Sequence, residues 1–71
     1  MNKSPAEIYA EGWRHAEASN AFGRNLVWLV FAWQGEWYDV VATFKGPTME
    51  ADAKAFADAV NALDPQRLAL V

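Results

Sequence analysis

The segment LVWLVFAW, from Leu26 to Trp33, constrains the fold of this chain more than any other feature. A β-strand with one face in water alternates apolar and polar residues, and this segment does not alternate. Gln34-Gly35 follows it as a two-residue turn, and a second strand is expected from Glu36 to Phe44. The sequence therefore predicts a hairpin that is apolar on both faces.

A helix is predicted on each side of the hairpin. Ser4-Pro5-Ala6-Glu7 has the pattern of a capping box with proline at the first helical position. Apolar side chains at helical spacing continue for about four turns, to Ser19-Asn20. Thr48 is the expected N-cap of a second helix, which Asp64-Pro65 ends. The tail, residues 67–71, is apolar and compatible with a short strand along an edge of the hairpin.

These elements predict one domain, residues 1–71, of the α+β class. The expected order is α-β-β-α: a two-stranded antiparallel hairpin, two packed helices and the tail as a third short strand. A turn at Gln34-Gly35 would divide the hairpin into two faces. The first face is almost wholly apolar, and we expect both helices to cover it. Its strand residues are Val27, Leu29, Phe31 and Trp33 with Tyr38, Val40 and Ala42.

The second face is mixed but holds two tryptophans, and three coverings stay open for it. One helix could lie on each side of the sheet, a second copy of the chain could bind there, or a different protein could dock. Exposed apolar patches of more than a few hundred Å² are uncommon on monomers, which favours a contact surface. The predicted partner-binding residues are those of this face and three carboxylates of the first helix: Trp28, Val30, Trp37, Asp39, Val41, Glu7, Glu11 and Glu17.

Catalytic and metal chemistry have little support in the sequence. Glu11, His15 and Ser19 are spaced four residues apart on the expected first helix, but one straight helix does not build an acyl-transfer site. Glu11 and His15 would supply two ligands where a structural zinc ion needs four. We therefore predict no enzyme activity, no cofactor and no metal. The chain has no cysteine, which favours a cytoplasmic setting, and its longest apolar run is too short for a membrane span.

Nucleic-acid binding is not favoured by the charge of the chain. The formal net charge is −3, and the six lysine and arginine residues are scattered. The helix-strand-strand-helix order resembles double-stranded RNA-binding domains, but that family opens its last helix with lysines and places a third strand before it. Here Glu50 and Asp52 open that helix, and no strand fits between Phe44 and Thr48. Single-strand binding by Trp28 and Trp37 would lack a basic rim.

A small, acidic, cysteine-free chain without catalytic motifs resembles phage-encoded inhibitors, including the anti-CRISPR proteins. The resemblance covers size, charge and the lack of enzymatic equipment, and no motif carries it. It implies a non-enzymatic protein that binds and occludes a host protein complex. The alternatives are a homodimeric accessory module and a single-stranded nucleic-acid-binding module.

Overall fold

Five elements follow one another in the computed structural model, which describes residues 2–22, 24 and 26–64. They are α1 (Pro5–Ala10), β1 (His15–Ser19), β2 (Trp28–Gln34), β3 (Trp37–Phe44) and α2 (Met49–Ala62). The α+β class is confirmed, and the order is α-β-β-β-α instead of α-β-β-α. The strand predicted for residues 67–71 lies outside the described residues.

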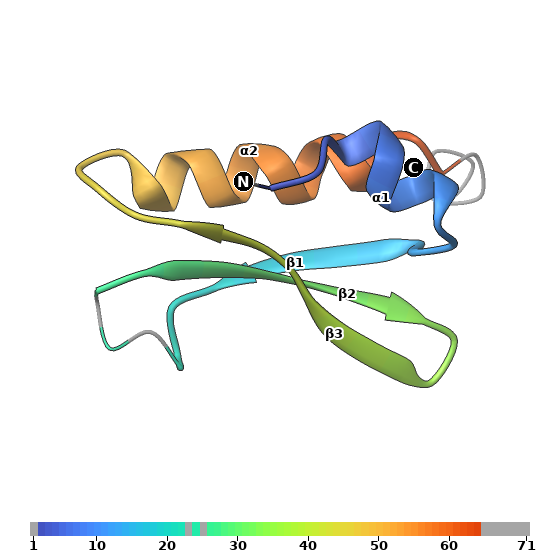
Figure 1. The fold of residues 1–71 in the computed structure, drawn as a ribbon, viewed down its shortest axis with the longest axis horizontal. Coiled ribbons are helices and arrows are strands. Elements are labelled where there is room, and N and C mark those ends of the chain that lie inside the picture. Colours follow the sequence, from blue (N-terminus) through green and yellow to red (C-terminus); the bar gives the residue numbers. More distant parts are fainter. Residues whose placement is uncertain (1, 23, 25, 65–71) are drawn as a thin grey trace.

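The three strands form one antiparallel sheet in the order β1-β2-β3. Both helices lie on the same side of this sheet (Figure 1). The longer helix, α2, packs against all three strands and also against α1. We call the covered side of the sheet the core face and the other side the open face. Within the described residues no helix covers the open face, so both helices share one face as expected, and the alternative of one helix on each side is excluded for these residues.

The first helix is much shorter than predicted. Its capping box is present, because the Ser4 hydroxyl accepts the Glu7 N–H and the Glu7 carboxylate accepts the Ser4 N–H. The helix nevertheless ends at Ala10, and Gly12 follows with a φ of 107° that favours glycine. Residues His15–Ser19 then form β1 on the edge of β2. Ala16 follows Gly12 and Trp13 at helical spacing, but Ala16 and Ala18 also fit a two-residue period, and pairing with β2 decides between the two.

The predicted hairpin is present in part, as β2 and β3 of a three-stranded sheet, and its turn is displaced by one residue. Gln34 pairs with Trp37, which leaves Gly35-Glu36 as the loop, and Gly35 has a φ of 64°. Trp33 therefore pairs with Tyr38 and not with Glu36. A register shift at Val30/Phe31 leaves Val41 as the extra residue of a bulge. The bulge moves Ala42 to the core face, opposite the buried Val30.

The core face is lined mainly by alanine, and this reverses the predicted assignment of the two faces. The fully or nearly fully buried apolar residues of the sheet and helices are Ile8, Ala16, Val30, Ala32, Ala42, Ala53, Ala57 and Val60. Small side chains on both layers let the backbone of α2 approach the strands closely, and larger ones would hold the layers apart. The bulky side chains of β2 at Phe31 and Trp33 consequently lie on the open face.

Candidate functional site

Five rings gather on the open face, and we call them the aromatic patch: His15, Phe22, Phe31, Trp33 and Tyr38. Every second residue of an antiparallel strand points to the same face. His15 of β1, Trp33 of β2 and Tyr38 of β3 therefore lie side by side across the sheet, opposite the face that buries Ala16 and Ala32. Phe22 joins them from the segment between β1 and β2.

The rings of the aromatic patch form one continuous series. Ring centroids are 5.4 Å apart for His15 and Trp33, and 5.8 Å apart for Trp33 and Tyr38, whose planes are nearly parallel at 29°. Tyr38 is 6.3 Å from Phe31, and Phe31 meets Phe22 edge-on at 5.8 Å. Pairs at such distances add about 0.5–1.5 kcal/mol beyond simple burial, so the rings support one another as a surface.

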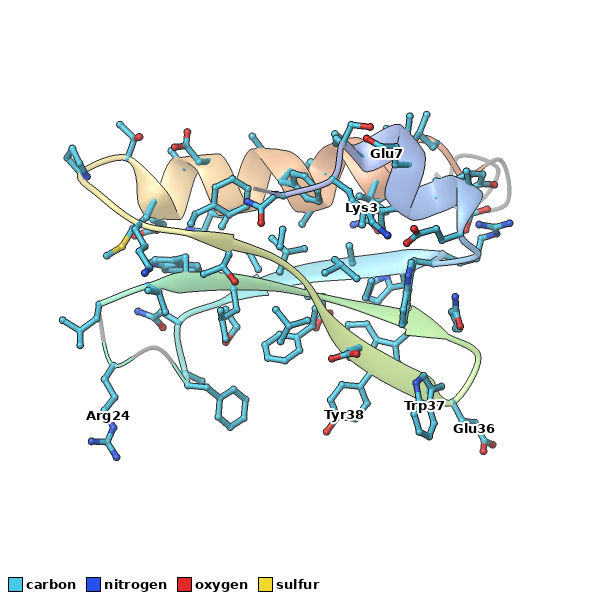
Figure 2. All side chains as sticks on the ribbon, in the orientation of Figure 1. Lys3, Glu7, Arg24, Glu36, Trp37 and Tyr38 are labelled. Atoms are coloured by element: carbon cyan, nitrogen blue, oxygen red, sulfur yellow. The ribbon has the colours of Figure 1, made fainter. Side chains whose placement is uncertain are left out.

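Two rings of this series are strongly exposed. Phe22, at one end, retains 78% of its accessible surface, and Tyr38, between Trp33 and Phe31, retains 60%, while Phe31 and Trp33 are half-buried. Tyr38 lies with Trp37 and Glu36 at the hairpin end of the sheet, away from the helices (Figure 2). Isolated exposed apolar residues are ordinary, whereas a contiguous group of large rings on a small monomer marks a contact site.

A shallow hollow of about 210 Å³ lies within the aromatic patch. Its walls are Glu17, Ser19, Phe22, Phe31, Trp33 and Tyr38. Glu17 pairs with Phe31 in the β1–β2 ladder, which places its carboxylate among the rings on the open face. Glu17 Oε1 lies 3.2 Å from Nε2 of His15. No lysine or arginine of the described residues lines this hollow.

Three apolar residues of β2 and β3 that were predicted to bind a partner lie on the core face instead. Val30 is completely buried and has no surface that a partner could contact. Trp28 is half-buried against the core, with the Lys54 ammonium 5.4 Å from its ring centroid. Val41 is half-buried and also packs against the core. These three side chains were placed on the wrong side because their own face is lined by alanines, which periodicity analysis weights less than aromatic residues.

Trp37 and Asp39 remain exposed, as expected, but near the end of the hairpin and beyond the core. Trp37 retains 70% of its surface. The Asp39 carboxylate accepts the N–H of Val40 at 2.8 Å, which holds it locally against its own strand. Neither residue lines the hollow of the aromatic patch.

The three carboxylates predicted to share one helix face are separated in the structure. Glu7 belongs to the capping box of α1, where the Ser4 N–H and hydroxyl lower the pKa of its carboxyl below the ordinary value. Glu11 caps the C-terminus of α1 and forms an ion pair with Lys3, whose own pKa is raised by that hydrogen bond. Of the three, Glu17 alone lies in β1 and on the open face.

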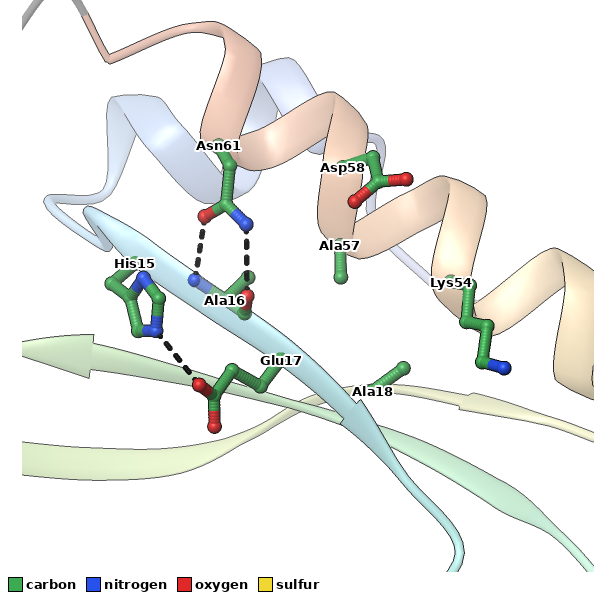
Figure 3. A pocket seen from close by; sticks show the side chains of 8 residues that line it. All are labelled: His15, Ala16, Glu17, Ala18, Lys54, Ala57, Asp58 and Asn61. Atoms are coloured by element: carbon green, nitrogen blue, oxygen red, sulfur yellow. Dashed lines mark hydrogen bonds and ion pairs between the residues drawn. The ribbon is translucent and has the colours of Figure 1, made fainter. Parts of the chain in front are cut away.

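A second hollow, of about 310 Å³, lies between β1 and α2 (Figure 3). There the Asn61 side chain accepts the Ala16 N–H at 2.8 Å and donates to the Ala16 carbonyl at 2.9 Å. Lys54, at the other end of the hollow, pairs with Glu50 at 2.6 Å. This region is therefore already organised by contacts within the chain.

The row of Glu11, His15 and Ser19 expected on one helix is not formed, because His15 and Ser19 lie in β1. Glu11 and His15 are not on one helix, and their partners are Lys3 and Glu17 respectively. No group of three histidine, aspartate or glutamate residues there is positioned to hold a metal ion. Of the helices that the structure describes, none has the length and apolar character needed to cross a membrane.

The double-stranded RNA-binding resemblance changes in one respect. A third strand does precede the last helix, because β1 supplies it ahead of the hairpin. The charge requirement is still unmet, since the first turn of α2 contains Glu50 and Asp52. Lys54 of the same helix is already paired with Glu50. The number of strands therefore no longer argues against double-stranded RNA binding, whereas the acidic first turn of α2 still does.

Comparison of the chain with protein family models, with curated proteins and with solved structures finds no match. The site must therefore be interpreted from its own geometry. Phe31, Trp33 and Tyr38 were expected on the covered face, and Phe22 was not expected at the surface. The sequence does contain a pattern that indicates a closely packed layer. Alanines occur at Ala16, Ala18, Ala32 and Ala42, and the final helix is also rich in alanine.

Proposed function

We propose that this protein is a non-enzymatic interaction domain that binds a basic surface of a different protein through the aromatic patch. One observation carries the proposal: a continuous series of rings crosses all three strands on the face that the helices leave open. Tryptophan and tyrosine dominate binding energy in protein interfaces, and here they lie on a rigid sheet where little side-chain ordering is required.

The charge of the chain favours a basic protein partner over a second copy. The net charge is −3, and Glu17 lies within the patch. A two-fold symmetric dimer would place the same surface against itself and bring two Glu17 carboxylates into one apolar contact. Like charges meeting in a desolvated interface are unfavourable, whereas a basic partner would supply their counter-ions. An inhibitor of the anti-CRISPR type is one form that such a domain can take, and that narrower expectation stays a prediction from size and charge.

The test is affinity capture with matched variants of the chain as bait. Tyr38→Ala and Phe22→Ala remove the two strongly exposed rings of the patch, and Trp37→Ala is the control because Trp37 retains 70% of its surface but lies outside the hollow. We expect a basic protein that is retained by the unmodified chain and by Trp37→Ala to be lost with the two patch variants, while all four baits melt at similar temperatures. Retention that is indifferent to Tyr38 and Phe22 would contradict the proposal.

Light scattering on the purified chain distinguishes binding of a different protein from association with a second copy of the chain. We expect the mass of one chain, 7.9 kDa. A mass of two chains that returns to one chain with Tyr38→Ala would show that the patch is a self-association surface. That result would mean that the partner of the aromatic patch is a second copy of the chain and not a basic protein.

A further inference from the structure

The hollow of the aromatic patch has the composition of a cation-binding site. Four aromatic side chains and one carboxylate line it, together with Ser19. The face of an aromatic ring attracts a cation within about 6 Å of its centroid, most strongly for tryptophan. A carboxylate beside the rings adds a direct counter-ion. This combination of groups differs from a purely apolar pocket, which would take a leucine or valine side chain.

We infer that the side chain seated in this hollow is an arginine of the partner, with its guanidinium against the rings and Glu17 as its counter-ion. The inference rests on the proposed function and specifies the central contact. Guanidinium is planar, stacks on aromatic faces and forms two parallel hydrogen bonds with a carboxylate, which the ammonium of lysine does not. Trp33 and Tyr38, whose rings stack on each other at an interplanar angle of 29°, both line the hollow that would receive it.

The chain already uses this chemistry within itself. The Arg14 guanidinium lies 4.0 Å from the centroid of the Tyr9 ring, and Lys54 lies over Trp28. Both of these cation–π contacts of the described residues involve rings outside the aromatic patch. Arg24 lies at the other end of the sheet from Tyr38 and does not line the hollow (Figure 2). A cation from outside the chain would meet the rings of Phe22, Phe31, Trp33 and Tyr38, which line the hollow.

Glu17 is able to receive such a cation. Its side chain is 62% exposed, and its contact with His15 uses Oε1. An ionised carboxylate has about four acceptor positions on two oxygens, so a guanidinium can bind without displacing His15. Its place opposite Phe31 in the ladder keeps the carboxylate beside the rings.

A nucleic acid fits the same rings less well. Bases would stack on Trp33 and Tyr38, but the adjoining phosphates would need lysine or arginine, and the described lining of the hollow contains neither. Glu17 in the hollow and Glu36 at the hairpin turn would repel the phosphate backbone. The electrostatics therefore favour an arginine side chain over a nucleotide.

The test is a nuclear magnetic resonance titration of the 15N-labelled chain with two short peptides. One contains alternating glycine and arginine, and the other replaces each arginine by citrulline, which has nearly the same shape without the charge. Oligothymidine is the third probe. We expect the arginine peptide to shift the Trp33 indole N–H signal and to bind at least about tenfold more tightly than the citrulline peptide. The Trp28 indole, on the core face, should not respond.

Glu17→Gln tests the counter-ion, with Glu36→Gln as the matched control outside the hollow. We expect Glu17→Gln to weaken the arginine peptide about five- to tenfold and Glu36→Gln to change it by less than about twofold. Equal binding of the arginine and citrulline peptides, or no effect of Glu17→Gln, would overturn the arginine contact. Tighter binding of oligothymidine would overturn it in favour of a nucleic acid. A Trp33 signal that responds to none of the probes would also overturn it.

These outcomes are independent of the test of the proposed function. The capture experiment asks whether Phe22 and Tyr38 hold any basic protein, whatever side chain enters the hollow. If the arginine peptide shows no preference but capture still depends on Phe22 and Tyr38, the proposed interaction domain is retained and only the arginine contact is rejected.

Discussion

Asn61 of α2 forms two hydrogen bonds with the backbone of Ala16 in β1, accepting its N–H at 2.8 Å and donating to its carbonyl at 2.9 Å. The two residues are 45 positions apart, and Asn61 is 92% buried, since it retains 8% of its surface. β1 is an edge strand, whose outward N–H and carbonyl groups would otherwise be open to pairing with another chain. The Asn61 side-chain amide forms the two hydrogen bonds that a neighbouring strand would form with Ala16, and it thereby links α2 to the edge of the sheet.

Asn61→Ala is expected to destabilise the fold by about 2 kcal/mol, because it leaves a buried N–H and carbonyl without partners. Urea denaturation followed by circular dichroism measures the change. The control is Asn2→Ala, since Asn2 makes the same pair of bonds with Thr43 on the opposite edge but in an exposed position. We expect a loss below about 1 kcal/mol there. Equal losses for the two variants would contradict the role given to burial.

Trp28→Ala should reduce the stability of the fold much more than Tyr38→Ala. Trp28 packs against the core, so its truncation should cost about 2–4 kcal/mol. Tyr38 retains 60% of its surface on the open face, and its removal should cost less than about 1 kcal/mol. Thermal and urea unfolding of both variants measure the difference. An unfolded Tyr38→Ala variant with an intact Trp28→Ala variant would mean that the two faces of the sheet are assigned the wrong way round.

Ala57→Leu tests the close approach of α2 to the sheet. Ala57 retains 4% of its surface in the core, so three added carbon atoms would push the layers apart. Overpacking of this kind costs about 1–3 kcal/mol. Ala59→Leu is the control on the same helix, because Ala59 is exposed, and we expect a change within about 0.5 kcal/mol. A neutral Ala57→Leu variant in urea denaturation would show that the alanine layer is not tightly packed.

The capping box of α1 should make part of the stability depend on pH. The pKa of the Glu7 carboxyl lies below its ordinary value of 4.5, because the folded chain donates hydrogen bonds from Ser4 to the ionised form. This contribution is therefore complete above the unfolded pKa and is lost as the pH falls through the lower folded pKa. Glu7→Gln keeps an acceptor for Ser4 but does not titrate.

The measurement is the urea midpoint of the unmodified chain and of Glu7→Gln between about pH 7 and about pH 3. We expect the advantage of the unmodified chain over Glu7→Gln to shrink as the pH falls below 4.5. An advantage that stays constant down to the lowest pH would exclude a depressed pKa at Glu7.

Local sequence patterns predicted the elements whose bounds depend on contacts between residues close together in the sequence. Ser4 and Glu7 determine the start of α1 through hydrogen bonds between residues three positions apart. The strands around Gly35 likewise follow from turn chemistry. The helix α2 begins after Thr48 and ends before Asp64 as predicted, although the Thr48 side chain makes no capping hydrogen bond. The class of fold and the acidic, cysteine-free character of the chain were also available from the sequence alone.

The tertiary structure decided what local patterns leave ambiguous. Residues 15–19 fit a helix or a strand, and the free edge of β2 made them a strand. A bulge at Val41 assigned Ala42 to the core face. The helix α2 then packed on the alanine-lined side of the sheet, because small side chains allow the closest contact between layers. That choice turned Phe31, Trp33 and Tyr38 outward beside Glu17, and so created the aromatic patch on the face that was predicted to be the core.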